Sequence, residues 1–344
     1  MSMTRAGRVG WQSPSGGEKF ILTLSGAAAA WPVAGRAQQP ANIQNKERRL
    51  GFLFAGTIAE RPQAQEFWRT LERLGYVEGK NLKTELREAR GHLERLPALA
   101  SEIVATHPDV IVAVTSPATA AAKAATQDIP IVMTIVGDPL GSGFVKSLAR
   151  PEGNVTGPSL MSNELTAKRV QFIKETLPNI SILGLLWNAT NAQNALMAKL
   201  AEEAASSIGV PLRSLPIHKP EDLQAALGRA FEERLSAVLV ANDSVTIDHR
   251  ADIVAFSLAK QIPTFHTFPE EALDGALAAY GPRLSNEYRR AAFYVDKILA
   301  GASPANLPVE QPTHFEFVLN MKTARSIGVT IPASILLAAD QVIE

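Results

Sequence analysis

Apolar and polar positions are arranged in repeating blocks from Arg49 onward. Short apolar runs, typical of strands buried on both faces of a sheet, alternate with longer stretches of helical spacing. Helices are predicted over 61–74 and 93–106, and again after residue 115. Strands are predicted at RLGFLF (49–54), NLKTELRE (81–88), VIVAV (110–114) and IPIVMTIV (129–136). This alternation predicts an α/β lobe built on a doubly wound parallel sheet.

The same pattern starts again after residue 180 and predicts a second lobe of the same type. Helices are expected to reach Ile208 and to cover 220–233, between strands at ISILGLLWN (180–188), PLRSLPI (211–217) and LSAVLVAND (235–243). Between the lobes, the Pro- and Gly-rich segment RPEGNVTGPSL (150–160) predicts a short strand that runs into a crossing. A second crossing is predicted at Gly281-Pro282, just before an amphipathic helix.

The first forty residues differ from the rest of the chain. An apolar stretch over 20–33 is too short to span a bilayer, and it is followed by the small-x-small sequence Gly35-Arg36-Ala37. This pattern predicts that residues 1–37 are an export signal peptide, removed after Ala37. Because the chain has no cysteine, we expect an exported form without disulfides and without a lipid-bearing cysteine, free in the periplasm.

Composition and motifs argue against several classes of protein. Lys plus Arg (34) balance Asp plus Glu (34), so nothing predicts a nucleic-acid partner. Three segments resemble catalytic motifs, but each lacks a required position. GYVEGKN (75–81) fails as a phosphate loop, GDPLGSG (137–143) as a dinucleotide fingerprint and GPSLM (157–161) as a nucleophile elbow. The six histidines lack metal-ligand spacing. We therefore expect no metal, no cofactor and no catalytic residues.

The join between the strand at 110–114 and the helix after it is a candidate binding feature. Thr115 and Ser116 offer capping hydroxyls, and Pro117 lies where a first helical turn needs no N–H. The helix N-terminus then opens at the carboxyl edge of the sheet, where a carboxylate or small anion can bind. Taken alone, the stretch favours an ordinary strand-to-helix turn. Asp138 and Asp243 follow strands of different lobes, so they are expected to face each other across a cleft and not to form a fixed catalytic pair.

Four segments carry a resemblance to a known family: GYVEGKN, GDP, GNVTG and NMKTARSIGVTIP. From about Arg49 to the C-terminus the chain resembles the TrpX-like substrate-binding proteins of ABC transporters. The resemblance implies a type I periplasmic-binding fold, with two Rossmann-like lobes joined by three crossings that close on a small molecule. The lobes are expected over 48–157 with 282–310, and over 158–281 with 311–344.

The same resemblance implies a receptor, not an enzyme. Its ligand would be an amino acid, with aromatic ones suggested by relatives that recognise them, or a related organic acid. Its partner would be an inner-membrane permease with its ATPase, and we expect a monomer. Two alternatives stay open: the ligand-sensing domain of a regulator, which lacks the expected helix-turn-helix here, and a two-domain α/β enzyme, which the motif search disfavours.

Strand ends supply the candidate ligand-binding residues. We expect Thr57 and Ser116 to bind a carboxylate and Asp243 to bind an amine, with loss of Asp243 costing affinity but little stability. Several of these candidates could instead have a structural role, as a helix cap, a turn former or a core residue. Trp187 is a further candidate for the cleft wall. The full set is Thr57, Ser116, Pro117, Ala118, Asp138, Asn188, Asp243, His266 and Tyr280.

Overall fold

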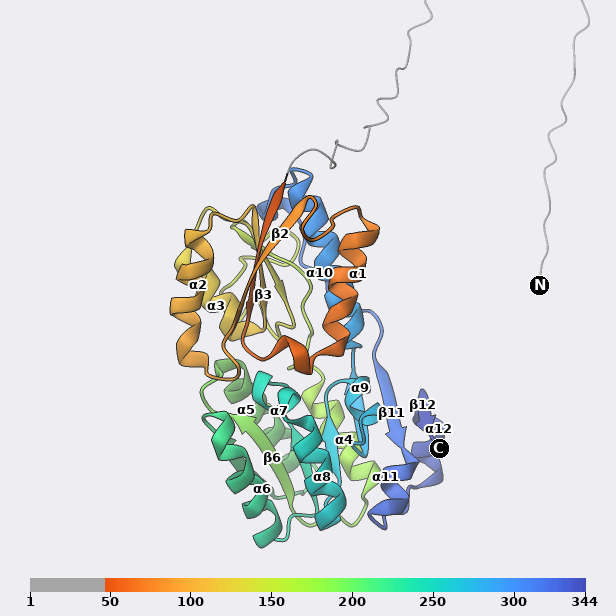
Figure 1. The fold of residues 1–344 in the computed structure, drawn as a ribbon. Coiled ribbons are helices and arrows are strands. Elements are labelled where there is room, and N and C mark those ends of the chain that lie inside the picture. Colours follow the sequence, from red (N-terminus) through yellow and green to blue (C-terminus); the bar gives the residue numbers. More distant parts are fainter. Residues whose placement is uncertain (1–46) are drawn as a thin grey trace, which may run out of the picture. The chain divides into compact units, whose positions relative to one another are not determined.

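The computed structural model describes residues 47–344 (Figure 1), and the predicted signal peptide lies outside the described residues. Within them, no helix is both long and apolar enough to cross a membrane. Two sheets organise this part of the chain. Each sheet has helices on both faces, as the alternating sequence pattern predicts.

The first sheet is parallel and has the strand order β2-β1-β3-β4-β5. Strands β3 and β4 are fully buried, and β1 is buried from Leu50 onward, which explains the apolar runs in these strands. Helices α1 and α10 pack together on one face, and α2 and α3 on the other. The elements are β1 (Arg48–Phe54), α1 (Gln65–Arg73), β2 (Leu82–Glu88), α2 (Leu96–Ala105), β3 (Val110–Val114), α3 (Ser116–Ala125), β4 (Ile131–Thr134), β5 (Val155–Thr156) and α10 (Leu284–Leu299).

The second sheet has seven strands in the order β12-β11-β10-β9-β8-β6-β7. Pro216 lies in β7, an edge strand, where a missing N–H disturbs no neighbouring strand. The strands are β6 (Leu183–Asn188), β7 (Leu212–Ile217), β8 (Ala237–Val240), β9 (Thr264–His266), β10 (Ala278–Gly281), β11 (Glu316–Asn320) and β12 (Gln341–Ile343). The helices are α4 (Thr166–Thr176), α5 (Ala192–Ser207), α6 (Leu223–Glu232), α7 (Ser244–Asp248), α8 (Arg250–Lys260), α9 (Pro269–Leu273), α11 (Met321–Ser326) and α12 (Ala333–Ala338).

Short 3-10 turns complete the fold. The helix expected over 61–74 begins with one of them, and α6 does the same. These turns are Ile58–Glu60, Pro62–Ala64, Leu93–Arg95, Pro220–Asp222 and Pro304–Asn306.

The pairing of β10 with β11 departs from a purely parallel sheet, because these two strands are antiparallel. After β10 the chain leaves the second sheet and forms α10, which packs against α1 and the first sheet. It then returns to start β11 beside the end of β10, so the new strand has to run in the opposite direction. The prediction of two α/β lobes is confirmed, with β11 and the β12 strand parallel to it reversed.

Three segments of chain connect the two sheets, at residues 157–165, 282–283 and 307–315. Gly157 has φ +137°, and a Cβ there would lie 2.1 Å from the carbonyl oxygen of Met133, so only glycine fits. Buried Arg169 ties the first of these segments to the end of β10. Its Nε donates to the carbonyl of Tyr280 and its Nη1 to the carbonyl of Ser162, each at 2.9 Å.

Candidate functional site

A small cavity of about 30 Å³ lies between the carboxyl ends of the two sheets. Its lining comes from the β3–α3 join and the segment after β4 on one side. The other side is formed by the first crossing, the start of α5 and the β8–α7 join. The lining residues are Thr115, Ser116, Ile135, Gly137, Ser162, Asn163, Asn191, Gln193, Asn194, Met197, Asn242 and Asp243.

The β3–α3 join is strained at the cavity wall. Thr115 has φ +87° and ψ 160°, a backbone region that is essentially reserved for glycine and costs on the order of 1–3 kcal/mol. Ile135, on the neighbouring segment, has φ +58°. Strain of this kind persists where the surrounding structure holds a functional geometry, and here two strained residues line one cavity.

The side chain of Thr115 does not cap α3, although its position at the helix start predicts that it would. Its Oγ1 is buried and has no hydrogen-bond partner within residues 47–344. The hydroxyl and the N-terminal end of α3 both belong to the cavity wall, which Ser116 completes. A helix N-terminus without a capping side chain favours an anion, so this wall suits a carboxylate.

Asn191 and Asn194 belong to the opposite wall, and Asn188 lies behind it. The Nδ2 of Asn188 donates to Oδ1 of Asp243 at 3.0 Å, and the Nδ2 of Asn191 donates to Oδ2 at 2.9 Å. Asn194 donates to the carbonyl of Asn242 at 2.9 Å. The spacing of three residues places all three amides on the same side of the chain, against the β8–α7 join.

Asp243 is only 3% exposed and is held by its neighbours. Its Oδ1 accepts from the amide N–H of Val245 at 2.9 Å and so caps α7, in addition to the bond from Asn188. The described residues provide Oδ2 with one donor only, the side chain of Asn191. Oδ2 is therefore the oxygen with room to accept from a ligand.

The structure brings two of the predicted ligand residues, Ser116 and Asp243, to the same cavity. Asn188 lies behind the wall, fully buried, and acts on the cavity through Asp243. Pro117 and Ala118 continue α3 but are not part of the lining. Asp138 accepts from the N–H of Gly141 at 2.7 Å, which is the turn-forming alternative for that residue.

His266 and Tyr280 lie within the second lobe and do not line the cavity. The Nδ1 of His266 is 2.9 Å from Oε1 of Glu271, with both side chains buried. Tyr280 packs edge-on against Phe172, with ring centroids 5.0 Å apart. Trp187 donates through Nε1 to the hydroxyl of Ser214 at 2.8 Å, on the edge strand pair β6–β7.

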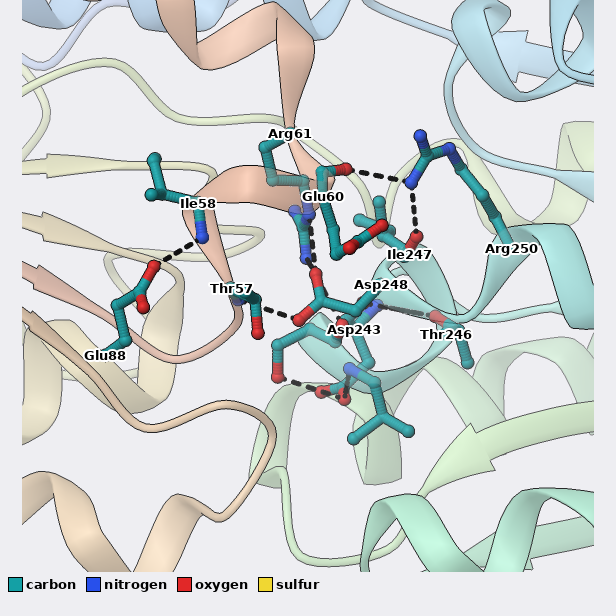
Figure 2. A network of polar contacts seen from close by, with 12 residues as sticks. Thr57, Ile58, Glu60, Arg61, Glu88, Asp243, Thr246, Ile247, Asp248 and Arg250 are labelled. Carbon is teal, nitrogen blue, oxygen red and sulfur yellow. Dashed lines mark hydrogen bonds and ion pairs between the residues drawn. The ribbon is translucent and has the colours of Figure 1, made fainter.

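Thr57 joins a polar network between the lobes (Figure 2). Its backbone N–H donates to Oδ2 of Asp248 at 2.7 Å, and the Nε of Arg61 donates to Oδ1 of the same carboxylate at 2.9 Å. Arg61 follows β1 in the first lobe, whereas Asp248 ends α7 in the second. Thr57, Arg61 and Asp248 are not part of the cavity lining, whereas Ser116 is. Thr57 therefore contacts the second lobe outside the cavity.

Sequence reasoning missed most of the polar residues of the cavity. Ser162, Asn163 and Gln193 lie in a crossing or in the first turn of α5, where the pattern of strand ends does not point. A signal was nevertheless present. The run NATNAQN (188–194) repeats asparagine every third residue directly after a strand, and that repeat marks one polar face.

The lining suits a polar ligand that carries both charges. One wall offers hydroxyls and a helix N-terminus, and the other offers a buried carboxylate among amides. Ile135 and Met197 add apolar contact. Among residues 47–344 no group of three or more metal-ligating side chains could hold a metal ion.

The known proteins that are similar to this chain include the following three. A tyrosine-binding protein of Clostridioides difficile (strain R20291) is 25% identical over 287 residues, which are 82% of this chain and 81% of that protein. A conserved domain protein from Vibrio cholerae O1 biovar eltor str. N16961 has a structure with TM-score 0.80 and 29% identity, covering 86% of this chain and all of that one. An ABC domain in complex with L-Trp, from Streptococcus pneumonia, has TM-score 0.78 and 23% identity, covering 87% and 100%.

The likeness to these structures confirms the expected fold of the type I periplasmic-binding proteins. The sequence model of one family, described as ABC transporter substrate binding protein, matches residues 62–343. That match includes every residue of the cavity lining and every strand of the two sheets except β1. The chain therefore belongs to the family of ABC transporter substrate-binding proteins, which bind small molecules for an ABC transporter.

Proposed function

We propose that this protein is a periplasmic receptor that delivers an L-α-amino acid to an ABC importer. The observation that carries the proposal is the pairing of two unlike walls in one cavity: the N-terminus of α3 with Thr115 on one side, and Asp243 on the other. A zwitterion presents a carboxylate and an ammonium to such a pair. The tyrosine and L-Trp relatives support an amino acid, and an aromatic one first.

The ligand carboxylate would lie against Ser116 and the N-terminus of α3, where Thr115 Oγ1 donates a hydrogen bond. The ammonium would donate to Oδ2 of Asp243. This arrangement replaces Thr57 with Thr115 as the second carboxylate donor, because Thr57 donates its N–H to Asp248 away from the cavity. It also gives the buried hydroxyl of Thr115 a partner.

Ligand entry requires the cleft to widen. A cavity of about 30 Å³ holds little more than a water molecule, whereas small-molecule pockets occupy roughly 300–1,000 Å³. We propose that the lobes, 48–157 with 282–310 and 158–281 with 311–344, rotate about the crossings near Gly157 and Gly281-Pro282. The assignment of 282–310 to the first lobe is supported by α10, which packs on the first sheet. The assignment of 311–344 to the second lobe is supported by β11 and β12, which extend the second sheet.

The remaining proposals concern the setting of the receptor. The leader would be removed near Ala37, leaving a monomer that is free in the periplasm and carries no lipid anchor. Its partner would be an inner-membrane permease with its ATPase, and the receptor itself would catalyse no reaction and need no cofactor. The apolar leader, the absence of cysteine and the family support these statements.

Replacing Thr115 by valine tests the carboxylate wall. The two side chains have the same shape, so the strained backbone is unaffected, but the hydroxyl is lost. A hydrogen bond to a charged group contributes about 1.5–3 kcal/mol, so we expect affinity for L-tyrosine or L-tryptophan to fall about ten- to one-hundred-fold. The free energy of unfolding should stay the same or rise, because a buried hydroxyl without a partner is removed. Calorimetric titration and urea unfolding measure the two quantities.

Thr264→Val is the matched control. Thr264 is also buried with an Oγ1 that lacks a partner in the described residues, but it lies in β9 and does not line the cavity. It should leave affinity unchanged and affect stability in the same way as Thr115→Val, because it also removes a buried hydroxyl without a partner. Equal affinities of the Thr115→Val variant and the unmodified protein would remove Thr115 from the ligand site.

A further inference from the structure

A buried ion pair between Arg61 and Asp248 joins the lobes (Figure 2), and neither of these two residues lines the cavity. Arg61 is 1% exposed, and its Nη2 lies 2.8 Å from Oδ1 of Asp248. The same nitrogen donates to the carbonyl of Ser244 at 3.2 Å, and the guanidinium lies over the ring of Phe54 at 5.0 Å. Each partner of the pair comes from a different lobe.

The pair has several of the extra contacts that a buried ion pair needs, although Nη1 of Arg61 is buried without a partner among residues 47–344. Removing two charges from water is costly, and their attraction offsets that cost only with good geometry and further hydrogen bonds. Here the Asp248 carboxylate accepts from Arg61 through one oxygen and from the N–H of Thr57 through the other. Nearby, Arg250 donates to the carbonyl of Glu60 at 2.8 Å and adds a second link between the lobes.

The backbone of the first lobe is shaped for this carboxylate. A Cβ on Gly56 would lie 2.8 Å from Oδ2 and 3.0 Å from Oδ1 of Asp248, and 3.1 Å from Nη2 of Arg61. Any side chain at position 56 would therefore push the pair apart. The absence of a side chain here lets Asp248 dock against the first lobe.

Helix α7 links the pair to the cavity. Asp243 caps the start of this helix and lines the cavity, and Asp248 ends the same helix five residues later. A short, fully hydrogen-bonded helix moves as one piece. Docking of Asp248 on Arg61 therefore brings Asp243 into position opposite Ser116.

We propose that Arg61 and Asp248 form a latch that holds the lobes together and so sets ligand affinity without touching the ligand. The two are positioning residues, and the proposal rests on the proposed function of the cavity. The apparent affinity of a receptor falls in proportion to the fraction of molecules in the binding-competent form. The latch raises that fraction before the ligand arrives.

The test measures the separation of the lobes without ligand. Because the chain has no cysteine, Ser101→Cys on α2 and Gln224→Cys on α6 give a unique pair of spin-label sites, both exposed and one on each lobe. In this background, electron–electron distance measurements compare the unmodified latch with two variants. Asp248→Asn removes the charge, and Gly56→Ala keeps every charge but inserts the methyl group that the docked carboxylate excludes.

Both variants should lower the ratio of docked to separated lobes, by about ten-fold for Asp248→Asn. Titration with L-tyrosine should show affinity falling in proportion to the measured fraction of docked molecules. Asp252→Asn is the matched control, because Asp252 pairs with His249 within its own lobe at 3.0 Å, and it should change neither quantity.

Two results would overturn the latch. The first is an unchanged distance distribution in both variants. The second is a loss of L-tyrosine affinity with no change in ligand-free distances, which would mean that Arg61 and Asp248 act on the ligand directly. Failure of the unmodified protein to bind L-tyrosine would contradict the proposed ligand alone, because the ligand-free distances still decide whether the latch exists.

Discussion

Replacing Asp243 by alanine should lower the free energy of unfolding by about 3–7 kcal/mol, even without ligand. The change removes the cap of α7, which costs about 1 kcal/mol, and leaves the buried amides of Asn188 and Asn191 without their acceptor, at about 1–3 kcal/mol each. On the sequence alone, this substitution was expected to affect affinity and little else. Urea unfolding of the ligand-free protein measures the loss.

Asp222→Ala is the control for this experiment. Its carboxylate also accepts backbone N–H groups, from His218 and Lys219, but it is exposed and holds no buried amide. We expect a much smaller loss of stability there. If Asp243→Ala destabilises the protein no more than the control does, then the asparagine wall is not held by this carboxylate. Any loss of ligand affinity could then be assigned to the lost ammonium partner.

Glu287→Gln should make the protein more stable at pH 8 but not at pH 4.5. Glu287 lies in the first turn of α10, is 1% exposed, and its Oε2 has no partner among residues 47–344. Burial raises the pKa of its carboxyl group from 4.5 to about 8, against the opposing effect of Arg290. Below pH 4.5 the carboxyl group is protonated in both the folded and the unfolded chain, so its protonation does not change the free energy of unfolding.

Between pH 4.5 and 8 the unfolded chain releases this proton while the folded protein keeps it. The contribution of Glu287 to stability is therefore lost as the pH rises through this window, by roughly 3–5 kcal/mol in all. Glutamine does not titrate, so the variant does not lose this stability. Its free energy of unfolding should therefore rise relative to that of the unmodified protein between pH 4.5 and 8. Urea unfolding at pH 4.5 and 8 tests this, with Glu202→Gln on the exposed surface of α5 as control. A stability difference that is the same at both pH values would contradict it.

The strands and helices could be predicted because each buried strand is a short apolar run and each helix has its own periodicity. VIVAV became β3 with the predicted ends, and LSAVLVAND contains β8. The direction of β11 could not be predicted in this way. It depends on where the chain re-enters the second lobe after α10, which is a tertiary property and leaves no local pattern.

Part of the cavity was also visible in the sequence. Ser116 and Asp243 directly follow buried strands, and the carboxyl edge of a parallel sheet brings such residues to one place. Thr57 follows the same rule but meets Asp248 instead, because its position depends on how the other lobe docks. The strained backbone of Thr115 was equally hidden, since threonine is a residue type that ordinarily avoids that conformation.

The most direct test of the central claim is calorimetric titration of the purified protein with matched pairs of ligands. L-Tyrosine and L-tryptophan carry both charges, whereas tyramine and tryptamine have the same side chains and ammonium groups but no carboxylate. If the N-terminus of α3 holds a carboxylate opposite Asp243, at least one of the amino acids binds and its amine binds at least one-hundred-fold more weakly, in line with a lost charged hydrogen-bond pair. Equal binding of an amino acid and its amine, or no binding of either amino acid, would contradict the account.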